Sequence, residues 1–105
     1  MAFFPWITMR LTAEQARAIR QTTAEIFGAG ARVWLFGSRM DDQAMGGDID
    51  LLIETERKPP LRQVLRAQAL LEQRLGTTVD ILTSSPGQAP SPIIEIARLT
   101  GAPLT

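Results

Sequence analysis

Two aspartates separated by one residue are the part of this sequence best suited to chemistry. Asp48 and Asp50 stand at the start of an apolar run that continues through Ile53. A carboxylate beside buried aliphatic side chains is costly unless a proton, a cation or hydrogen bonds compensate its charge. Because side chains alternate between the two faces of a strand, Asp48 and Asp50 are expected to point the same way. Oxygen ligands at this spacing suit Mg²⁺, which takes one or two carboxylates and fills its remaining positions with waters and substrate phosphates.

A glycine and a serine precede this pair and end an earlier apolar run. Gly37 allows close approach of another group to the backbone, and Ser38 adds a hydroxyl. Free N–H groups at such a turn form a site for phosphate, particularly where a helix begins. A loop of nine residues, 39–47, separates the turn from the aspartates. We therefore expect a phosphate site and a metal site side by side.

Two further charged residues stand out in the sequence. Arg39 follows the phosphate turn directly. We expect it to pair with a phosphate bound at that turn or, equally, with Asp41 or Asp42 in a local surface ion pair. Asp80 is an isolated acid in the middle of an apolar strand expected over residues 77–82. Such an acid needs a partner.

Composition excludes several other kinds of catalytic site. The 105 residues contain no Cys and no His, which removes thiolate sites, histidine bases and histidine metal ligands. Carboxylates remain as the acid or base groups near neutral pH. The 11 basic and 11 acidic residues sum to a net charge of zero, so we expect no direct nucleic-acid binding. The sequence also lacks Tyr, so any tyrosine that it modifies belongs to another molecule.

The length predicts a single domain over residues 1–105. No apolar run approaches a membrane span, and the apolar N-terminal segment lacks the basic start of a signal peptide. With the absence of Cys, these features favour a cytoplasmic location and no membrane contact. We expect the aromatic side chains of Phe3, Phe4 and Trp6 to cover the core or contact a partner rather than to stack on bases. Whether the chain forms a homo- or hetero-oligomer stays open.

Three helices and three strands are expected to position the candidate residues. Helix starts are indicated by a capping box over Thr12–Gln15, by Pro60 and by Ser91, and helix ends by Gly28, Gly76 and Gly101. Strands are expected over residues 31–36, 48–54 and 77–82.

Apolar periodicity predicts which side of each helix faces the core. The expected inward residues are Ala16, Ile19, Thr23, Ile26 and Phe27 in the first helix, Leu61, Val64, Leu65, Leu71 and Leu75 in the second, and Ile93, Ile94, Ile96 and Ala97 in the third. Leu70 falls opposite the second set, so it is either contacted from a second side or solvated.

Taken in this order, the motifs resemble those of the nucleotidyltransferase superfamily of DNA polymerase β. They are most similar to the minimal nucleotidyltransferases of bacteria and archaea. The matching segments are LFGSR at 35–39, GDIDLLI at 47–53 and VDIL at 79–82. The resemblance implies an α+β fold in which a small mixed β-sheet packs against helices.

The resemblance also implies roles for the candidate residues. Asp48 and Asp50 would hold Mg²⁺, with two ions expected, and the nucleotide. Gly37 and Ser38 would hold the triphosphate, and Asp80 would complete the metal site and aid the acceptor hydroxyl. The sequence departs from the family in a slightly shorter spacer before the aspartate pair and in Gly47, where the family often has Ser.

A partner is implied as well. Many minimal nucleotidyltransferases resemble this chain in length and are paired with a small all-helical HEPN protein, an RNase toxin. They act as its antitoxin by transferring AMP from ATP to a tyrosine, and the short chain is consistent with an acceptor supplied from outside. Two alternatives stay open. The fold could neutralise the toxin by binding alone, against which the intact aspartate trio argues, or it could modify a small molecule, which the missing acceptor domain disfavours.

Overall fold

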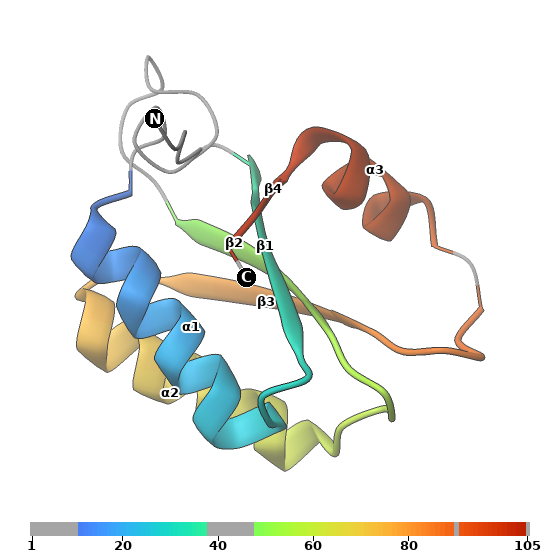
Figure 1. Ribbon diagram of the computed structural model, residues 1–105, viewed down its shortest axis with the longest axis horizontal. Coiled ribbons are helices and arrows are strands. Elements are labelled where there is room, and N and C mark those ends of the chain that lie inside the picture. The colour runs from blue at the N-terminus through green and yellow to red at the C-terminus, as the bar shows by residue number, and fades with distance from the viewer. Residues whose placement is uncertain (1–10, 38–47, 90, 105) are drawn as a thin grey trace.

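The computed structural model describes residues 11–37, 48–89 and 91–104. These residues form, in order, α1 (Ala13–Phe27), β1 (Arg32–Phe36), β2 (Ile49–Glu54), α2 (Leu61–Leu75), β3 (Val79–Ser84), α3 (Pro92–Thr100) and β4 (Ala102–Pro103). Within them, three helices pack with one mixed sheet of four strands, which confirms the expected α+β fold (Figure 1). The aromatic N-terminal segment and the loop that carries Ser38 and Arg39 lie outside the described residues.

The first helix begins at the predicted capping box. The Thr12 hydroxyl accepts from the Gln15 backbone N–H at 3.0 Å, and the Gln15 side chain accepts from the Thr12 backbone N–H at 2.9 Å. Two donors that the helix itself cannot satisfy are thus paired. This fixes where α1 starts.

Strand pairing gives the sheet its order, β3-β2-β1-β4. β1 runs antiparallel to both β2 and β4, whereas β3 runs parallel to β2. A parallel pair requires a crossover connection, which α2 supplies. The C-terminal end of β1 and the N-terminal ends of β2 and β3 therefore lie at the same end of the sheet.

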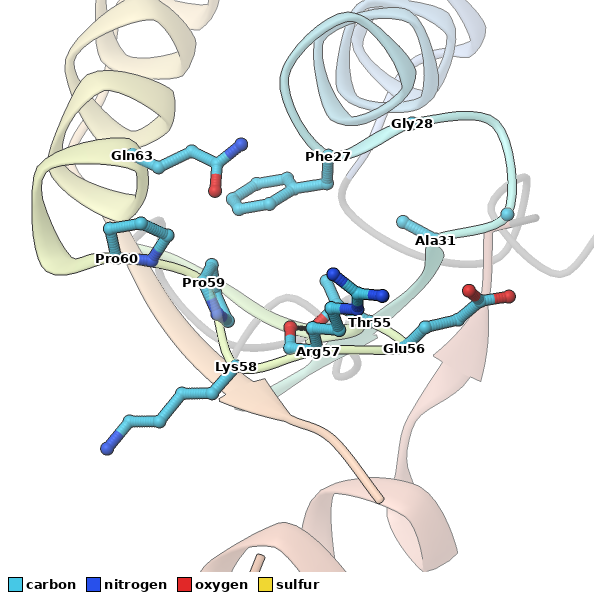
Figure 2. Close-up of a pocket in the computed structure, with 11 residues that line it drawn as sticks. Phe27, Gly28, Ala31, Thr55, Glu56, Arg57, Lys58, Pro59, Pro60 and Gln63 are labelled. Carbon is cyan, nitrogen blue, oxygen red and sulfur yellow. Dashed lines mark hydrogen bonds between the residues drawn. The ribbon is translucent and has the colours of Figure 1, made fainter. Parts of the chain in front are cut away.

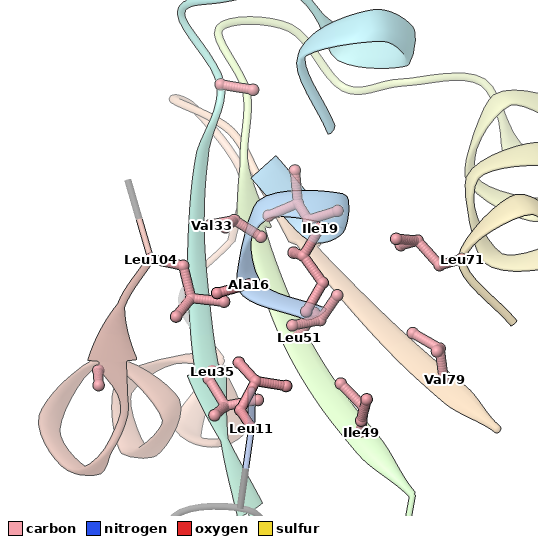
Figure 3. Close-up of a cluster of buried hydrophobic side chains, with 13 residues drawn as sticks. Leu11, Ala16, Ile19, Val33, Leu35, Ile49, Leu51, Leu71, Val79 and Leu104 are labelled. Atoms are coloured by element: carbon pink, nitrogen blue, oxygen red, sulfur yellow. The ribbon is translucent and has the colours of Figure 1, made fainter. Parts of the chain in front are cut away.

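The main core lies between the sheet and the α1–α2 pair (Figure 3). Alternate residues of β2, Ile49, Leu51 and Ile53, are fully buried on this side. The residue between two of them, Leu52, is buried on the opposite face against Ile94 and Ala97 of α3. The sheet is therefore covered on one face by two helices and on the other by α3, and the even-numbered β2 residues belong to the α3 face.

Two helices bury only part of the apolar residues that were expected to face the core. Leu61 and Leu65 of α2 are exposed, and a buried alanine, Ala67, joins Leu71 in their place. Ile93 and Ile96 of α3 are also exposed, and only Ile94 and Ala97 of the predicted set are buried. Each helix carries more apolar positions than one buried side can hold, so apolar periodicity identified only part of the buried side, including Leu71 and Leu75 of α2.

The strand pattern differs at the C-terminus. The segment after α3 was expected only to end the helix, but Ala102 and Pro103 pair with Leu35 and Trp34 as β4. Proline is tolerated there because β4 is an edge strand.

Among the helices that the structure describes, none is long and apolar enough to cross a membrane.

Candidate active site

The end of β1 and the start of β2 meet at Gly37 and Asp50. Gly37 follows β1 and has a φ of +79°, a conformation that L side chains rarely adopt. A β-carbon at this position would overlap Oδ2 of Asp50 and would lie 3.0 Å from its Cγ. Glycine is therefore needed for two reasons, the backbone angle and the space taken by the carboxylate. The candidate phosphate turn and the candidate metal ligand are in direct contact.

Two of the three candidate aspartates occupy neighbouring positions on adjacent strands. Asp50 of β2 is paired in register with Asp80 of β3. In a sheet, such neighbours point to the same face, which here is the α3 face. Asp50 is half-buried and Asp80 is exposed. Residues 30 positions apart in sequence thus present two carboxylates at the same end of the sheet, as the resemblance implied.

The surroundings of Asp50 disfavour its charge. Burial raises the pKa of the Asp50 carboxyl above its ordinary value, and the negative charges of Asp80 and Asp48 raise it further. Both causes act in the same direction because each makes the ionised form less stable. A bound cation would relieve both, so the electrostatics at Asp50 fit a metal ligand.

Asp48, like Asp80, is an exposed aspartate. It immediately precedes β2 and contributes to the electrostatic field at Asp50. Nevertheless, among the residues that the structure describes, no three Asp or Glu side chains lie close enough together to hold a metal ion. Asp50 and Asp80 share a site through strand pairing. No described group of three acids forms a closed set of metal ligands.

The remaining candidates are only partly described. Gly37 lies where the sequence predicted it, beside Asp50. Ser38 and Arg39 fall in the segment 38–47, outside the described residues. The expected contact of Ser38 with the triphosphate and both alternatives for Arg39, a phosphate contact or a local ion pair, therefore stay predictions.

A sizeable pocket lies at the other end of the sheet. Its volume is about 550 Å³, and it is bounded by the C-terminal end of α1, the N-terminal end of α2 and the loop between β2 and α2. The Phe27 ring and the Gln63 side chain extend toward each other across it, whereas Lys58 points away (Figure 2). None of the candidate aspartates lines this pocket.

A polar cluster that sequence reasoning missed lies on the α3 face, centred on Glu54. Trp34 Nε1 donates to Glu54 Oε1 at 2.8 Å, and Arg98 donates to Glu54 Oε2 from Nε at 3.0 Å and from Nη2 at 2.7 Å. Arg98 Nη2 also donates to the Ser84 hydroxyl at 3.0 Å. Burial alone would raise the pKa of Glu54, but the hydrogen bonds from Trp34 and Arg98 and the charges of Arg98 and Arg32 together lower it. The only sequence signal was a second acid, Glu54, at the end of the strand that carries Asp50.

Comparison with known families agrees with this geometry. The chain matches the family described as "Polymerase beta, Nucleotidyltransferase" over residues 21–104. The match covers most of the chain, and the chain belongs to this family. A search among curated proteins gave no match. The matched range contains Gly37, Asp48, Asp50 and Asp80, and membership supports a nucleotidyltransferase type of activity.

Proposed function

We propose that this chain transfers AMP from ATP, with Mg²⁺, to a hydroxyl of a partner protein. The acceptor in this proposal is a tyrosine of a HEPN-type RNase toxin, so the chain acts as the antitoxin. The observation that carries the proposal is the in-register pair of Asp50 and Asp80 beside Gly37, in a chain of the polymerase β nucleotidyltransferase family. Membership supports the transfer chemistry. The nucleotide, acceptor and partner follow from the resemblance to minimal nucleotidyltransferases.

The carboxylates are the residues that would hold the metal. Asp50 and Asp80 fit this role by their oxygen donors and shared face, and Asp48 would add a third carboxylate. Bound Mg²⁺ supplies positive charge that stabilises the attacking and leaving oxygens of the transfer. The protein contributes mainly position, since phosphoryl and nucleotidyl transfers need little covalent chemistry from side chains.

In the proposed transfer, the acceptor oxygen forms a bond to the α-phosphorus of ATP. The bond from that phosphorus to the oxygen bridging it to the β-phosphate breaks, and pyrophosphate leaves. Asp80 is more exposed than Asp50, so its carboxylate is the better placed of the two to receive the proton of the acceptor hydroxyl. Gly37 leaves the space that the Asp50 side chain occupies. Because the 105 residues contain no tyrosine, a tyrosine acceptor would come from outside them.

A second candidate is a binding module that neutralises the partner without chemistry. One observation favours it: the described residues include no group of three acids close enough to hold a metal. The two candidates give opposite results in one assay, because only the enzyme consumes ATP.

The assay combines the purified chain, Mg²⁺, ATP labelled at the α-phosphate, and the purified protein encoded by the neighbouring reading frame. We expect label to appear on that protein, and the double variant Asp48→Asn with Asp50→Asn to abolish the transfer while remaining folded. Removing two mutually repelling carboxylates should leave the melting temperature unchanged or higher. Glu56→Gln is the matched control, because Glu56 is an exposed acid beyond the other end of β2. Undiminished transfer by the double variant would refute the site assignment, and partner binding without labelling by the wild type would establish the binding module.

A further inference from the structure

The third helix is apolar on two opposite sides. Its inner side buries Ile94 and Ala97 against the sheet. Its outer side presents Ile93, Ile96 and Leu99, which are 52%, 57% and 81% exposed. Residues three apart lie about 60° apart around a helix, so these three form one continuous stripe. We call it the α3 stripe.

Water is an unfavourable environment for such a surface. A helix at the surface of a globular protein normally turns charged and polar residues outward, and a helix that is apolar all round is normally covered. The exposed leucines of α2, Leu61 and Leu65, differ because Arg62 and Arg66 lie beside them on that helix. On α3, Arg98 is turned toward Glu54 and also donates from Nη1 to Glu95 at 3.4 Å, so Glu95 is the exposed charged residue of this helix. The α3 stripe is therefore a candidate contact surface.

The α3 stripe ends beside the candidate active site. α3 covers the sheet face to which Asp50 and Asp80 belong (Figure 1). Just after the helix, Gly101 is packed so closely on β1 that a β-carbon there would lie 2.7 Å from the Leu35 carbonyl oxygen and 3.3 Å from Cβ of Phe36. Phe36 is in turn paired in register with Asp50. Leu99, the most exposed residue of the stripe, is thus at its end nearest the aspartates.

We propose that the α3 stripe is the docking surface for the acceptor protein whose hydroxyl receives the nucleotide. This inference rests on the proposed function, because it names the surface by which the acceptor reaches that site. The acceptor would present a complementary apolar groove or helix face, with basic residues at its rim opposite Glu95 and the acidic site. Docking on α3 would hold the acceptor hydroxyl at the end of the sheet where Asp80 is exposed.

The size of the stripe favours a transient acceptor over a second copy of the chain. A stable dimer buries about 800 Å² on each partner. Three partly exposed aliphatic side chains supply only a fraction of that area. Short-lived complexes form with smaller interfaces, and an enzyme must release its product. The position of the α3 stripe beside the candidate active site and its small area therefore both indicate a transient acceptor protein.

The test measures docking separately from chemistry. A double variant, Ile96→Gln with Leu99→Gln, replaces two residues of the stripe by a polar side chain that favours helix and adds no charge. The matched control, Leu61→Gln with Leu65→Gln, makes the same change on α2, where the leucines are 72% and 54% exposed. The probe is the purified protein encoded by the neighbouring reading frame. Its affinity is measured by calorimetry in the Asp48→Asn, Asp50→Asn background, and its KM and kcat are measured in the active background.

We expect the α3 variant to weaken binding of the probe and raise its KM by at least about tenfold, roughly the effect of losing one well-packed apolar contact. Mg²⁺-dependent ATP affinity, kcat at saturating probe and melting temperature should match those of the α2 control. If the probe binds and the α3 variant binds it less tightly, docking is supported even when no AMP is transferred, which would refute only the proposed chemistry.

Three results would overturn the docking surface. One is equal affinity of the wild type and the α3 variant for the probe, and transfer by the wild type would then leave the proposed function intact. Another is failure of the wild type to bind the probe at all. The third is a wild-type dimer in light scattering that the α3 variant converts to monomer, since a second copy would then cover the stripe.

Discussion

The same face of β2 carries a carboxylate near each end, and their surroundings shift the two pKa values in opposite directions. Asp50 has a raised pKa, because burial and the charges of Asp80 and Asp48 all disfavour its ionised form. Glu54, four positions further along, has a lowered pKa despite burial. Trp34 and Arg98 supply the difference, with hydrogen bonds of 2.7 to 3.0 Å. Among the described residues, Trp34 and Arg98 compensate the charge of Glu54, whereas the neighbours of Asp50 include two further acids that disfavour its charge.

This contrast separates a structural acid from a candidate functional one. The Glu54 cluster joins β1, β2, β3 and α3, so its polar groups satisfy one another and hold the helix on the sheet. At the Asp50 end, strand register places a second acid, Asp80, beside the first. Adjacent acids without a cation destabilise the fold, and such arrangements concentrate at functional sites. The comparison therefore supports the proposal that the Asp50 end is the catalytic one, and it indicates that the Glu54 end contributes to stability.

The strongest test at the functional end is Asp80→Asn. If Asp80 mainly receives the acceptor proton, this variant should retain much of the Mg²⁺-dependent ATP affinity yet transfer nucleotide at least about a hundredfold more slowly, the scale of losing a positioned base. Calorimetry with ATP and Mg²⁺ and a single-turnover transfer assay would measure the two quantities. A loss of binding as large as the loss of rate would show instead that Asp80 mainly holds the nucleotide's metal.

The structural end should respond in stability and not in activity. Arg98→Met keeps the length of the side chain but removes its hydrogen bonds to Glu54 and Ser84. We expect the free energy of unfolding to fall by about 1–2 kcal/mol, the usual cost of leaving a partly buried acceptor unpaired. ATP affinity should not change. The control is Arg66→Met, because Arg66 is an exposed arginine of α2. Reduced ATP affinity of Arg98→Met together with unchanged stability would contradict the division between the two ends.

Local signals predicted much of the fold. The capping box fixed the start of α1, and the glycines at positions 28 and 76 marked the ends of α1 and α2 correctly, because caps act over a few residues. The alternation around Asp50 separated the two faces of β2, since Ile49, Leu51 and Ile53 belong to the main core and Leu52 is buried on the opposite face. These features depend only on near neighbours in the sequence.

Long-range features could not be predicted in the same way. The pairing of Asp50 with Asp80 came from a family resemblance, because no local pattern encodes the register of a parallel pair. The contact between Glu54 and Arg98 joins residues 44 positions apart, and the sequence does not show which way Arg98 turns. The apolar residues of α3 surround a helix of nine residues, so periodicity did not separate Ile94 from the exposed Ile93 and Ile96. Ser38 and Arg39 lie outside the described residues, and their roles stay predictions.

The smallest expected effect is a pair of pH dependences of opposite sign. The pKa of Asp50 is raised in the folded chain, so above the ordinary value of about 3.9 the folded state holds more of this proton than the unfolded state does. Stability then falls as the pH rises through that interval. The pKa of Glu54 is lowered, so its contribution is complete above the ordinary value of about 4.3 and is lost as the pH falls through its lowered pKa.

Two variants read these signs separately. Asp50→Asn should be more stable than the wild type at pH 7 and should lose that advantage as the pH falls toward about 4. Glu54→Gln should be less stable than the wild type at pH 7, and the difference should shrink on further acidification, because protonated Glu54 no longer attracts Arg98 as an anion. Urea unfolding across this pH range, in EDTA so that cations do not bind the aspartates, would measure both differences. Curves for the two variants that shift in the same direction with pH would contradict the distinction, because a raised and a lowered pKa give opposite slopes.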